Sequence, residues 1–164
     1  MLERFYPDRV SPSTYDIDFE KLYKDGVRGL IFDIDNTLVP HGAPADARAK
    51  KLFARLKKMG FACCLLSNNG EHRVKMFNKD IGVHYICHAH KPSTANYKKA
   101  MELMGTNLKN TVFIGDQLFT DIYGAKRLGM ANILVRPIHP KEEIQIVLKR
   151  RLEKIVLHFY EKNK

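Results

Sequence analysis

The sequence predicts an α/β fold: a doubly wound, mainly parallel sheet in a single domain. Short aliphatic or β-branched runs alternate with longer amphipathic stretches along the chain, and repeated strand-then-helix units form parallel sheets with right-handed crossovers. Polar residues suited to catalysis directly follow several of the apolar runs. The length of 164 residues suits one hydrophobic core, since domains typically span ~100–200 residues.

The first half of the predicted core contains two strands around one helix. The apolar run 27–32 predicts a buried strand. Pro44 is a favourable helix start, and the amphipathic stretch from there to Lys58 predicts a helix that Gly60 ends. The aliphatic run 61–66 predicts the next strand.

The second half repeats this pattern, with glycines marking the helix ends. Gly105 and Gly129 each follow an amphipathic stretch and precede an apolar run, as expected for helix stops. The predicted elements in this half are a helix over 71–80, a short strand over 85–87, a helix over 92–104, a strand over 111–114, a helix over 120–128 and a strand over 132–135.

Two carboxylates, Asp33 and Asp35, stand two residues apart at the end of the first strand. Strand geometry places residues i and i+2 on the same face, so the two acids are expected to lie close together. Two such charges repel unless a cation or a shared proton relieves them. A polar strand end that caps the next element is the plain alternative, but it leaves three further polar stretches unexplained.

These three stretches are Ser67-Asn68-Asn69, Lys91-Pro92 and the segment 115–121, and each follows an apolar run. In an open parallel sheet the carboxyl ends of the strands line one edge, and ligands bind outside it. The stretches should therefore converge with the acid pair. Carboxylates suit a hard divalent cation, and hydroxyl and ammonium groups suit phosphoryl oxygens, so the set predicts a phosphate and metal site.

The motifs D-x-D-x-T, S-N, K-P and G-D-x-x-x-x-D, in this order between Val27 and Val135, resemble those of the haloacid dehalogenase (HAD) superfamily of aspartate-nucleophile phosphohydrolases. The resemblance implies that Asp33 is the nucleophile and that Asp35 acts as general acid and then base. The remaining implied roles are phosphate binding by Thr37, Ser67, Asn68 and Lys91, catalytic charge balance by Lys91, Mg²⁺ binding by Asp33, Asp116 and the carbonyl of Asp35, and support of the metal from a second shell by Asp121.

Asp35 also bears on the class of reaction. An acid two residues beyond the nucleophile can protonate a leaving alkoxide and later activate water, whereas the family's dehalogenases and P-type ATPases carry other residue types there. The sequence therefore predicts a Mg²⁺-dependent phosphomonoester hydrolase with an aspartyl-phosphate intermediate. Two alternatives stay open: a phosphoacceptor or regulatory module that binds Mg²⁺ and phosphate without turnover, and a phosphatase of soluble nucleotide or sugar phosphates.

The spacing of the motifs leaves no room for a lid domain. The gaps 38–66 and 68–90 are each filled by one predicted helix and one predicted strand. Within the superfamily this resembles the capless subclass III, and the sequence around Asp33 resembles the branch that includes phosphatidylglycerophosphate phosphatases. This resemblance implies phosphatidylglycerophosphate as the candidate substrate, and an open site suits a bulky or surface-bound substrate of this kind.

The predicted organisation is an N-terminal arm (1–25), a catalytic core (26–138) and a basic amphipathic helix (139–164) that packs on the core. The net charge is +10, which favours polyanionic partners. The expected partner is a phosphorylated substrate, and an anionic membrane surface or a second copy of the chain are further candidates for the C-terminal helix. Nucleic acid is disfavoured, since no binding motif or aromatic and basic platform is present.

The sequence further predicts a cytoplasmic protein, with membrane contact limited to the periphery. No apolar run approaches the ~18 residues that span a bilayer, and the first residues are polar where a signal peptide is apolar. The adjacent Cys63 and Cys64 are expected to be reduced core thiols. The segment 84–90 holds three histidines and Cys87, but zinc is disfavoured there because no second Cys/His cluster completes a ligand set. His41 and His90 are expected near the rim of the site.

Overall fold

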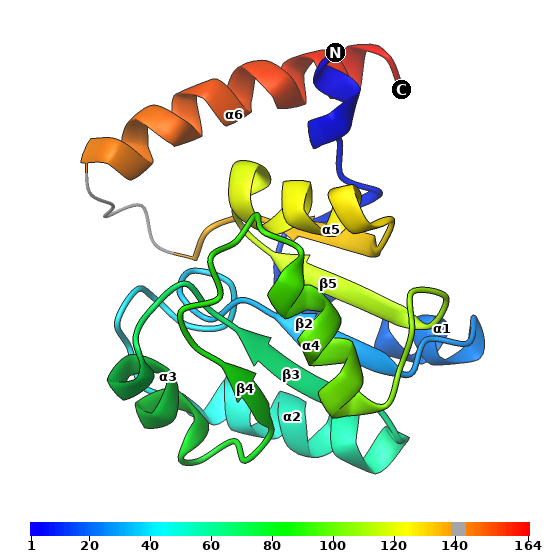
Figure 1. The fold of residues 1–164 in the computed structure, drawn as a ribbon, viewed down its shortest axis with the longest axis vertical. Coiled ribbons are helices and arrows are strands. Elements are labelled where there is room, and N and C mark those ends of the chain that lie inside the picture. Colours follow the sequence, from blue (N-terminus) through cyan, green and yellow to red (C-terminus); the bar gives the residue numbers. More distant parts are fainter. Residues whose placement is uncertain (139–143) are drawn as a thin grey trace.

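The computed structural model describes residues 1–138 and 148–164 in full and the backbone of 144–147. Its centre is a six-stranded sheet in the order β1-β6-β5-β2-β3-β4, in which every neighbouring pair is parallel. The predicted doubly wound parallel sheet is confirmed (Figure 1). The strands are β1 (Arg9–Ser11), β2 (Gly29–Phe32), β3 (Ala62–Leu66), β4 (His84–Ile86), β5 (Thr111–Gly115) and β6 (Ala131–Val135).

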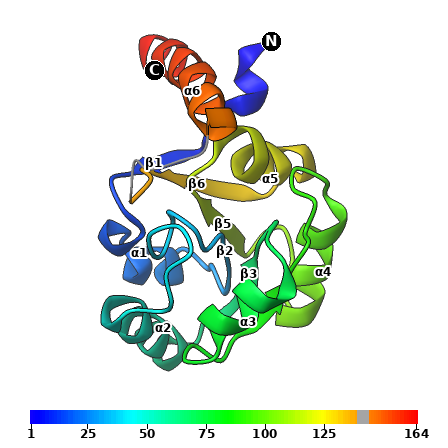
Figure 2. The same cartoon turned by 90° about the vertical axis from the view of Figure 1, so that its left-hand side faces the viewer.

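Helices cover both faces of this sheet, as the view along its edge shows (Figure 2). The α-helices are α1 (Phe19–Lys24), α2 (Ala47–Met59), α3 (Glu71–Asn78), α4 (Ala95–Met104), α5 (Tyr123–Leu128) and α6 (Ile144–Lys162). Shorter turns are the 3₁₀ helices η1 (Leu2–Phe5) and η2 (Thr14–Asp16) and the π-helical turn η3 (Leu118–Ile122).

Alternation along β2 builds the two main cores. Leu30 and Phe32 pack into one apolar cluster with α1, α2 and α3, while Ile31 packs into a second cluster with α4 and α5. Strand residues i and i+2 share a face, so a single buried strand contributes to both layers. The nucleophile candidate Asp33 comes directly after this central strand, and its N–H still donates to the carbonyl of Ile114 at 3.0 Å.

Several element boundaries differ from the predicted ones for local reasons. The helix expected from Pro44 begins at Ala47, because the Asp46 carboxylate accepts a hydrogen bond from the Ala49 N–H at 2.8 Å and so caps it. The helix expected over 92–104 begins at Ala95. The helix expected over 120–128 consists of the π-turn η3 followed by α5.

The N-terminal segment, expected as an accessory arm, supplies the edge strand β1. This strand pairs in parallel with β6, and the contact is locked by the carboxylate of Asp8, which accepts a hydrogen bond from Asn132 Nδ2 at 3.1 Å. Farther along, the Thr14 hydroxyl donates to the carbonyl of Thr37 at 2.8 Å. The first 25 residues thus support the loop that follows Asp33.

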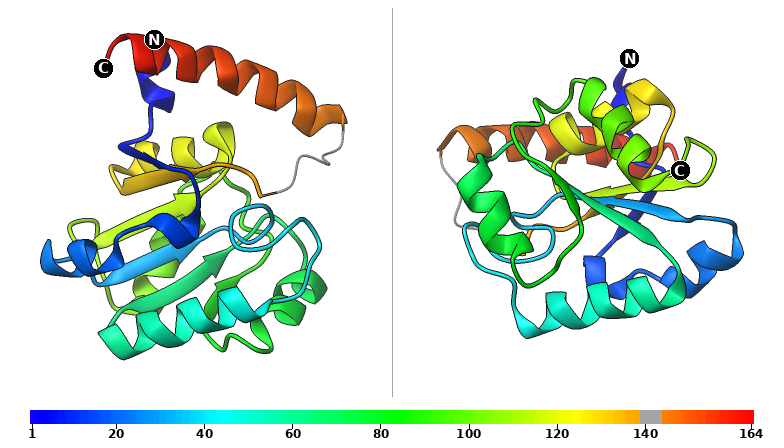
Figure 3. Two further views of the ribbon diagram at one scale, coloured as in Figure 1. Left: turned by 180° about the vertical axis from the view of Figure 1, so that it is seen from behind. Right: turned by 60° about the horizontal axis from the view of Figure 1, so that its bottom comes forward.

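Helix α6 lies across the end of the molecule beyond α5, and both chain ends lie beside each other there (Figures 1 and 3). Val156 is buried in a third apolar cluster with Leu118, Ile122 and Leu134, and the rings of Tyr6 and Tyr160 are 5.3 Å apart. The first residues predicted for this helix, 139–143, lie outside the described residues.

A cavity of about 600 Å³ remains between α6 and the ends of β1 and β6. Among the described residues, every helix is too short or too polar to cross a bilayer.

Candidate active site

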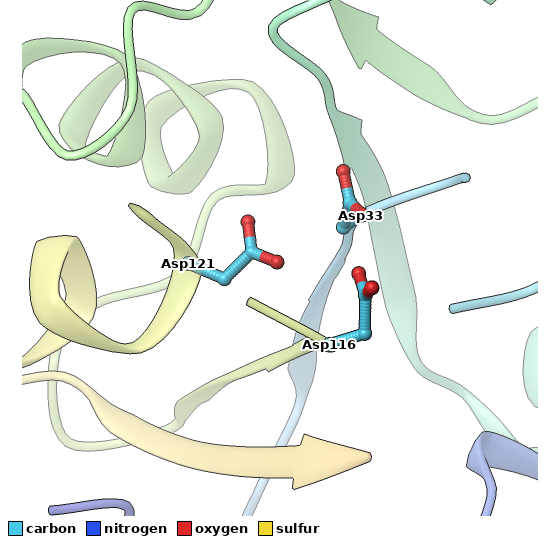
Figure 4. Close-up of side chains that lie close together, drawn as sticks. All are labelled: Asp33, Asp116 and Asp121. Carbon is cyan, nitrogen blue, oxygen red and sulfur yellow. The ribbon is translucent and has the colours of Figure 1, made fainter. Parts of the chain in front are cut away.

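Three aspartates converge at the carboxyl edge of the sheet (Figure 4). Asp33 follows β2, Asp116 follows β5, and Asp121 lies in the π-turn η3. All three are buried, and one carboxylate oxygen from each lies within 4.8 Å of the others. The predicted convergence of the first and last motifs is therefore what the fold produces.

In the G-D-x-x-x-x-D motif, the backbone leaves no space for a side chain at Gly115. A Cβ atom there would lie 2.5 Å from the carboxylate oxygen Oδ2 of Asp121. Helix α4 also contacts this loop. The Tyr97 hydroxyl lies within hydrogen-bonding distance of two acceptors, the carbonyl of Thr120 at 3.1 Å and that of Asp121 at 2.9 Å. These contacts fix the direction of the Asp121 carboxylate.

Lys91 connects two of the aspartates. Its ammonium group donates to Asp33 Oδ1 at 2.9 Å and to Asp121 Oδ1 at 2.6 Å. Asn68 holds the lysine backbone, because its Oδ1 accepts the Lys91 N–H at 2.8 Å and its Nδ2 donates to the Lys91 carbonyl. Burial opposes the charge of Lys91, but Asp121 and Asp33 outweigh burial and raise its pKa above the ordinary value. The ammonium therefore stays charged.

The ammonium of Lys91 balances only part of the negative charge of the three aspartates. Burial, followed by the charge of Asp33, raises the pKa of Asp116 well above its ordinary range and that of Asp121 to about 6. Buried carboxylates that repel one another in this way favour a bound divalent ion. Because all the donors are hard oxygens, the residues fit Mg²⁺.

Thr37 lies behind the aspartates. Its hydroxyl donates to Asp116 Oδ1 at 2.9 Å and is 3.3 Å from Asp33 Oδ2, and its side chain is buried. In this arrangement the threonine orients the two carboxylates. Contact between Thr37 and a phosphoryl group stays a prediction.

Asp35 lies apart from the three-aspartate cluster, and its carboxylate is surrounded by donors. Oδ1 accepts hydrogen bonds from the Gly42 N–H at 2.7 Å and from Arg73 Nη2 at 2.9 Å, and Oδ2 accepts one from Asn69 Nδ2 at 2.6 Å. His41 Nδ1 lies 3.9 Å from Oδ1. Four residues from three segments thus hold the carboxylate in one orientation.

A cavity of about 300 Å³ opens in front of these groups. Ser67 reaches it from the end of β3, where its hydroxyl also accepts the Asn69 N–H at 3.0 Å. Gln117 and Thr120, which sequence reasoning did not single out, add polar groups to the wall. The lining consists of Asp33, Asp35, Asn36, His41, Ser67, Asn68, Asn69, Lys91, Gln117, Thr120 and Asp121.

Helix α6 also reaches this site, a contact that the sequence did not predict. The guanidinium of Arg150 pairs with the Asp116 carboxylate and donates to its carbonyl oxygen. Glu153 accepts a hydrogen bond from the Leu118 N–H at 2.7 Å and one from Arg150 Nη1 at 3.0 Å. Both ends of the loop that carries Asp116 are therefore linked to the C-terminal helix.

Comparison with known proteins agrees with this fold. The HAD-hydrolase-like family matches residues 88–145, and the chain is a phosphatase that belongs to the HAD superfamily. It is 36% identical over 159 residues to a Bacillus subtilis protein named "Probable phosphatase YqeG", covering 96% of this chain and 92% of that protein.

A second relative is the chloroplastic and mitochondrial phosphatidylglycerophosphate phosphatase 1 of Arabidopsis thaliana, 28% identical over 158 residues. That match covers 86% of this chain but 44% of the plant protein. The fold resembles the cobalt-bound deoxy-D-mannose-octulosonate 8-phosphate phosphatase of Haemophilus influenzae, with a TM-score of 0.54, 16% identity and coverage of 70% of each chain.

Proposed function

We propose that this protein is a Mg²⁺-dependent phosphomonoesterase that works through an aspartyl-phosphate on Asp33, with phosphatidylglycerophosphate as its substrate. One observation carries the chemistry: the Asp33 carboxylate lines the cavity with one oxygen held by Lys91 at 2.9 Å, and Asp35 lines the same cavity. A carboxylate nucleophile with a cation beside it is the arrangement that phosphoryl transfer requires.

In the first half of the reaction, a carboxylate oxygen of Asp33 attacks phosphorus in line with the leaving alkoxide. Lys91 and the Ser67 hydroxyl, which line the cavity, stabilise the charge on the phosphoryl oxygens. Asp35 gives its proton to the leaving oxygen, so the alcohol departs uncharged. The products of this step are the free alcohol and Asp33 carrying the phosphoryl group.

In the second half, water attacks the phosphoryl group on Asp33. Asp35 now accepts the proton of that water and so returns to its protonated form, while inorganic phosphate leaves and the Asp33 carboxylate is restored. The hydrogen bonds from Gly42, Asn69 and Arg73 hold the Asp35 side chain in one position at the cavity wall.

Asp33 and Asp116, with the carbonyl of Asp35, would hold Mg²⁺, and Asp121 would support it. When bound, the ion neutralises negative charge on the transferring phosphoryl group. Thr37 and Arg150 contact the two oxygens of the Asp116 carboxylate, so Arg150 would have to share this carboxylate with the ion.

Asp116→Ala is expected to raise the Mg²⁺ concentration for half-maximal activity at least ~10-fold, because it removes a hard oxygen ligand. Asp121→Ala should raise it less. Calcium should bind and inhibit, because its longer and more flexible coordination disturbs the in-line geometry. Two measurements check the effects of the substitutions: Mg²⁺ titrations of p-nitrophenyl phosphate hydrolysis and calorimetry of Mg²⁺ binding. The exposed Asp80→Ala is the matched control, and unchanged Mg²⁺ activation in Asp116→Ala would contradict the metal assignment.

The substrate proposal is supported by two points. The relatives from Arabidopsis thaliana and Chlamydomonas reinhardtii carry the name phosphatidylglycerophosphate phosphatase. Among the described residues, the segments between the motifs hold single helices and no lid domain, and an open site of this kind suits a headgroup presented at a surface.

A substrate panel tests this proposal. Phosphatidylglycerophosphate in mixed vesicles is expected to be hydrolysed with a higher kcat/KM than glycerol 3-phosphate, nucleoside monophosphates or sugar phosphates. Asp33→Asn provides the blank for each substrate. A clear preference for a soluble nucleotide or sugar phosphate would reject the lipid substrate and leave the phosphatase chemistry in place.

A further inference from the structure

Helix α6 exposes a continuous apolar stripe to solvent. Its members recur at intervals of four, three and four residues, which places them along one face of a helix. Side chains of this size and character are usually buried. The stripe consists of Leu148 (55% exposed), Leu152 (56%), Ile155 (54%) and Phe159 (42%).

The stripe is presented by a helix that is anchored on the body of the protein. Val156 and Glu153 are buried, and they lie on a different side of α6 from the stripe. The Glu153 carboxylate accepts the Leu118 N–H, and Arg150 pairs with Asp116. The exposed face is therefore held in a fixed position relative to the active site.

One flank of the apolar stripe is basic. Helical spacing of about 100° per residue places Arg151, Lys154 and Lys162 along this flank, and all three are exposed. Arg151 and Lys154 also line the rim of the cavity between α6 and the ends of β1 and β6. An apolar stripe beside a row of cations is the pattern of helices that lie in the interface of anionic membranes. The whole chain adds to this attraction through its net charge of +10.

A second copy of the chain fits this surface less well. The four stripe residues offer a few hundred Å² at most, while a stable dimer buries ~800 Å² per partner. Two copies packed stripe to stripe would also bring their basic flanks close together, and like charges there disfavour the pair. An anionic lipid surface meets both the apolar stripe and the cations.

We propose that α6 docks the protein on an anionic lipid bilayer, with the stripe at the acyl boundary and the basic flank at the headgroups. This inference rests on the proposed lipid substrate for its purpose, since docking would bring the active site to membrane-bound phosphomonoesters. Because Arg150 joins α6 to Asp116, the docked helix lies beside the catalytic loop.

Co-sedimentation of the full chain with vesicles tests the docking surface. Wild type should bind phosphatidylglycerol/phosphatidylcholine vesicles, bind pure phosphatidylcholine much less, and lose binding as salt rises. Leu152→Ser/Ile155→Ser should weaken binding at least ~10-fold. Arg151→Gln/Lys154→Gln should weaken it at least ~10-fold, at roughly fivefold per charge.

Matched controls separate this surface from general changes. Leu103→Ser on α4, exposed to 41% in the native protein, and Lys57→Gln/Lys58→Gln on α2 should bind vesicles as wild type does. All variants should hydrolyse p-nitrophenyl phosphate at the wild-type rate, which shows that their fold and chemistry are intact. Wild type that binds vesicles but hydrolyses no phosphate ester would reject the proposed function and retain the docking surface.

Two results would overturn the docking proposal. One is vesicle binding by the stripe variant equal to that of wild type. The other is a stable wild-type dimer in light scattering that the stripe variant dissociates, without vesicle binding by either protein, which would assign the stripe to a second copy.

Discussion

Asp33→Asn is expected to reduce kcat by ~10³-fold or more while the protein stays folded. The amide is a poor nucleophile. Among the described residues of the cavity, Asp121 is the other carboxylate that Lys91 contacts, and it lies on a different element from Asp33. Removal of one of three buried like charges should also leave the unfolding temperature unchanged or higher. Steady-state hydrolysis of p-nitrophenyl phosphate and thermal unfolding measure the two effects.

The covalent intermediate gives this prediction a second readout. Rapid acid quenching followed by mass spectrometry should find phosphate on the peptide that contains Asp33 in wild type and not in Asp33→Asn. Beryllofluoride, which mimics a phosphoryl group on a carboxylate, should inhibit wild type. The exposed Asp25→Asn is the matched control. Substantial turnover in Asp33→Asn would eliminate the aspartyl-phosphate mechanism.

Asp35→Asn is expected to slow turnover of alkyl phosphates by ~10²–10⁴-fold, the usual contribution of a general acid or base. The loss in the first step should be smaller for aryl phosphates, because their leaving groups need little protonation. With aryl substrates the second step then becomes limiting, so the aspartyl-phosphate should accumulate and product should appear in a burst. Quench-flow kinetics on both substrate types measure these effects.

Arg73→Gln provides the comparison for Asp35. It removes one of the groups that orient the carboxylate but leaves the carboxylate itself, so its loss of activity should be smaller. Equal losses on aryl and alkyl phosphates in Asp35→Asn, without a burst, would show that Asp35 acts structurally and does not transfer protons.

The central fold was predictable because its signals are local. The strands β2, β3, β5 and β6 are mostly apolar, with Thr111 and Asn132 as the polar exceptions, as expected for strands that are buried on both faces. β1 was missed because it has only three residues, two of them exposed, and its partner β6 lies more than 120 residues away. Pairing of this kind depends on tertiary structure, which a short sequence window does not contain.

The residues of the candidate site also divide into those that local sequence predicts and those that depend on tertiary structure. Asp33 and Asp116 follow strands directly and Lys91 comes five residues after β4, so the parallel topology was sufficient to predict that these three residues lie at the same edge of the sheet. Arg73 was within reach of sequence reasoning, since it lies in the first turn of the helix after Ser67-Asn68-Asn69. Arg150 was not, because its contact with Asp116 depends on how α6 crosses the molecule.

The central position of β2 in the sheet determines which strands can open locally without disturbing the active site. This strand is paired on both sides, with β3 and β5, whereas β1 and β4 are edge strands. Local opening starts where few backbone hydrogen bonds and packing contacts must break together. Fluctuations at β1 and β4 can therefore proceed while the backbone of β2 stays closed, so we expect the amide protons of β2, which leads to the proposed nucleophile Asp33, to exchange last with solvent.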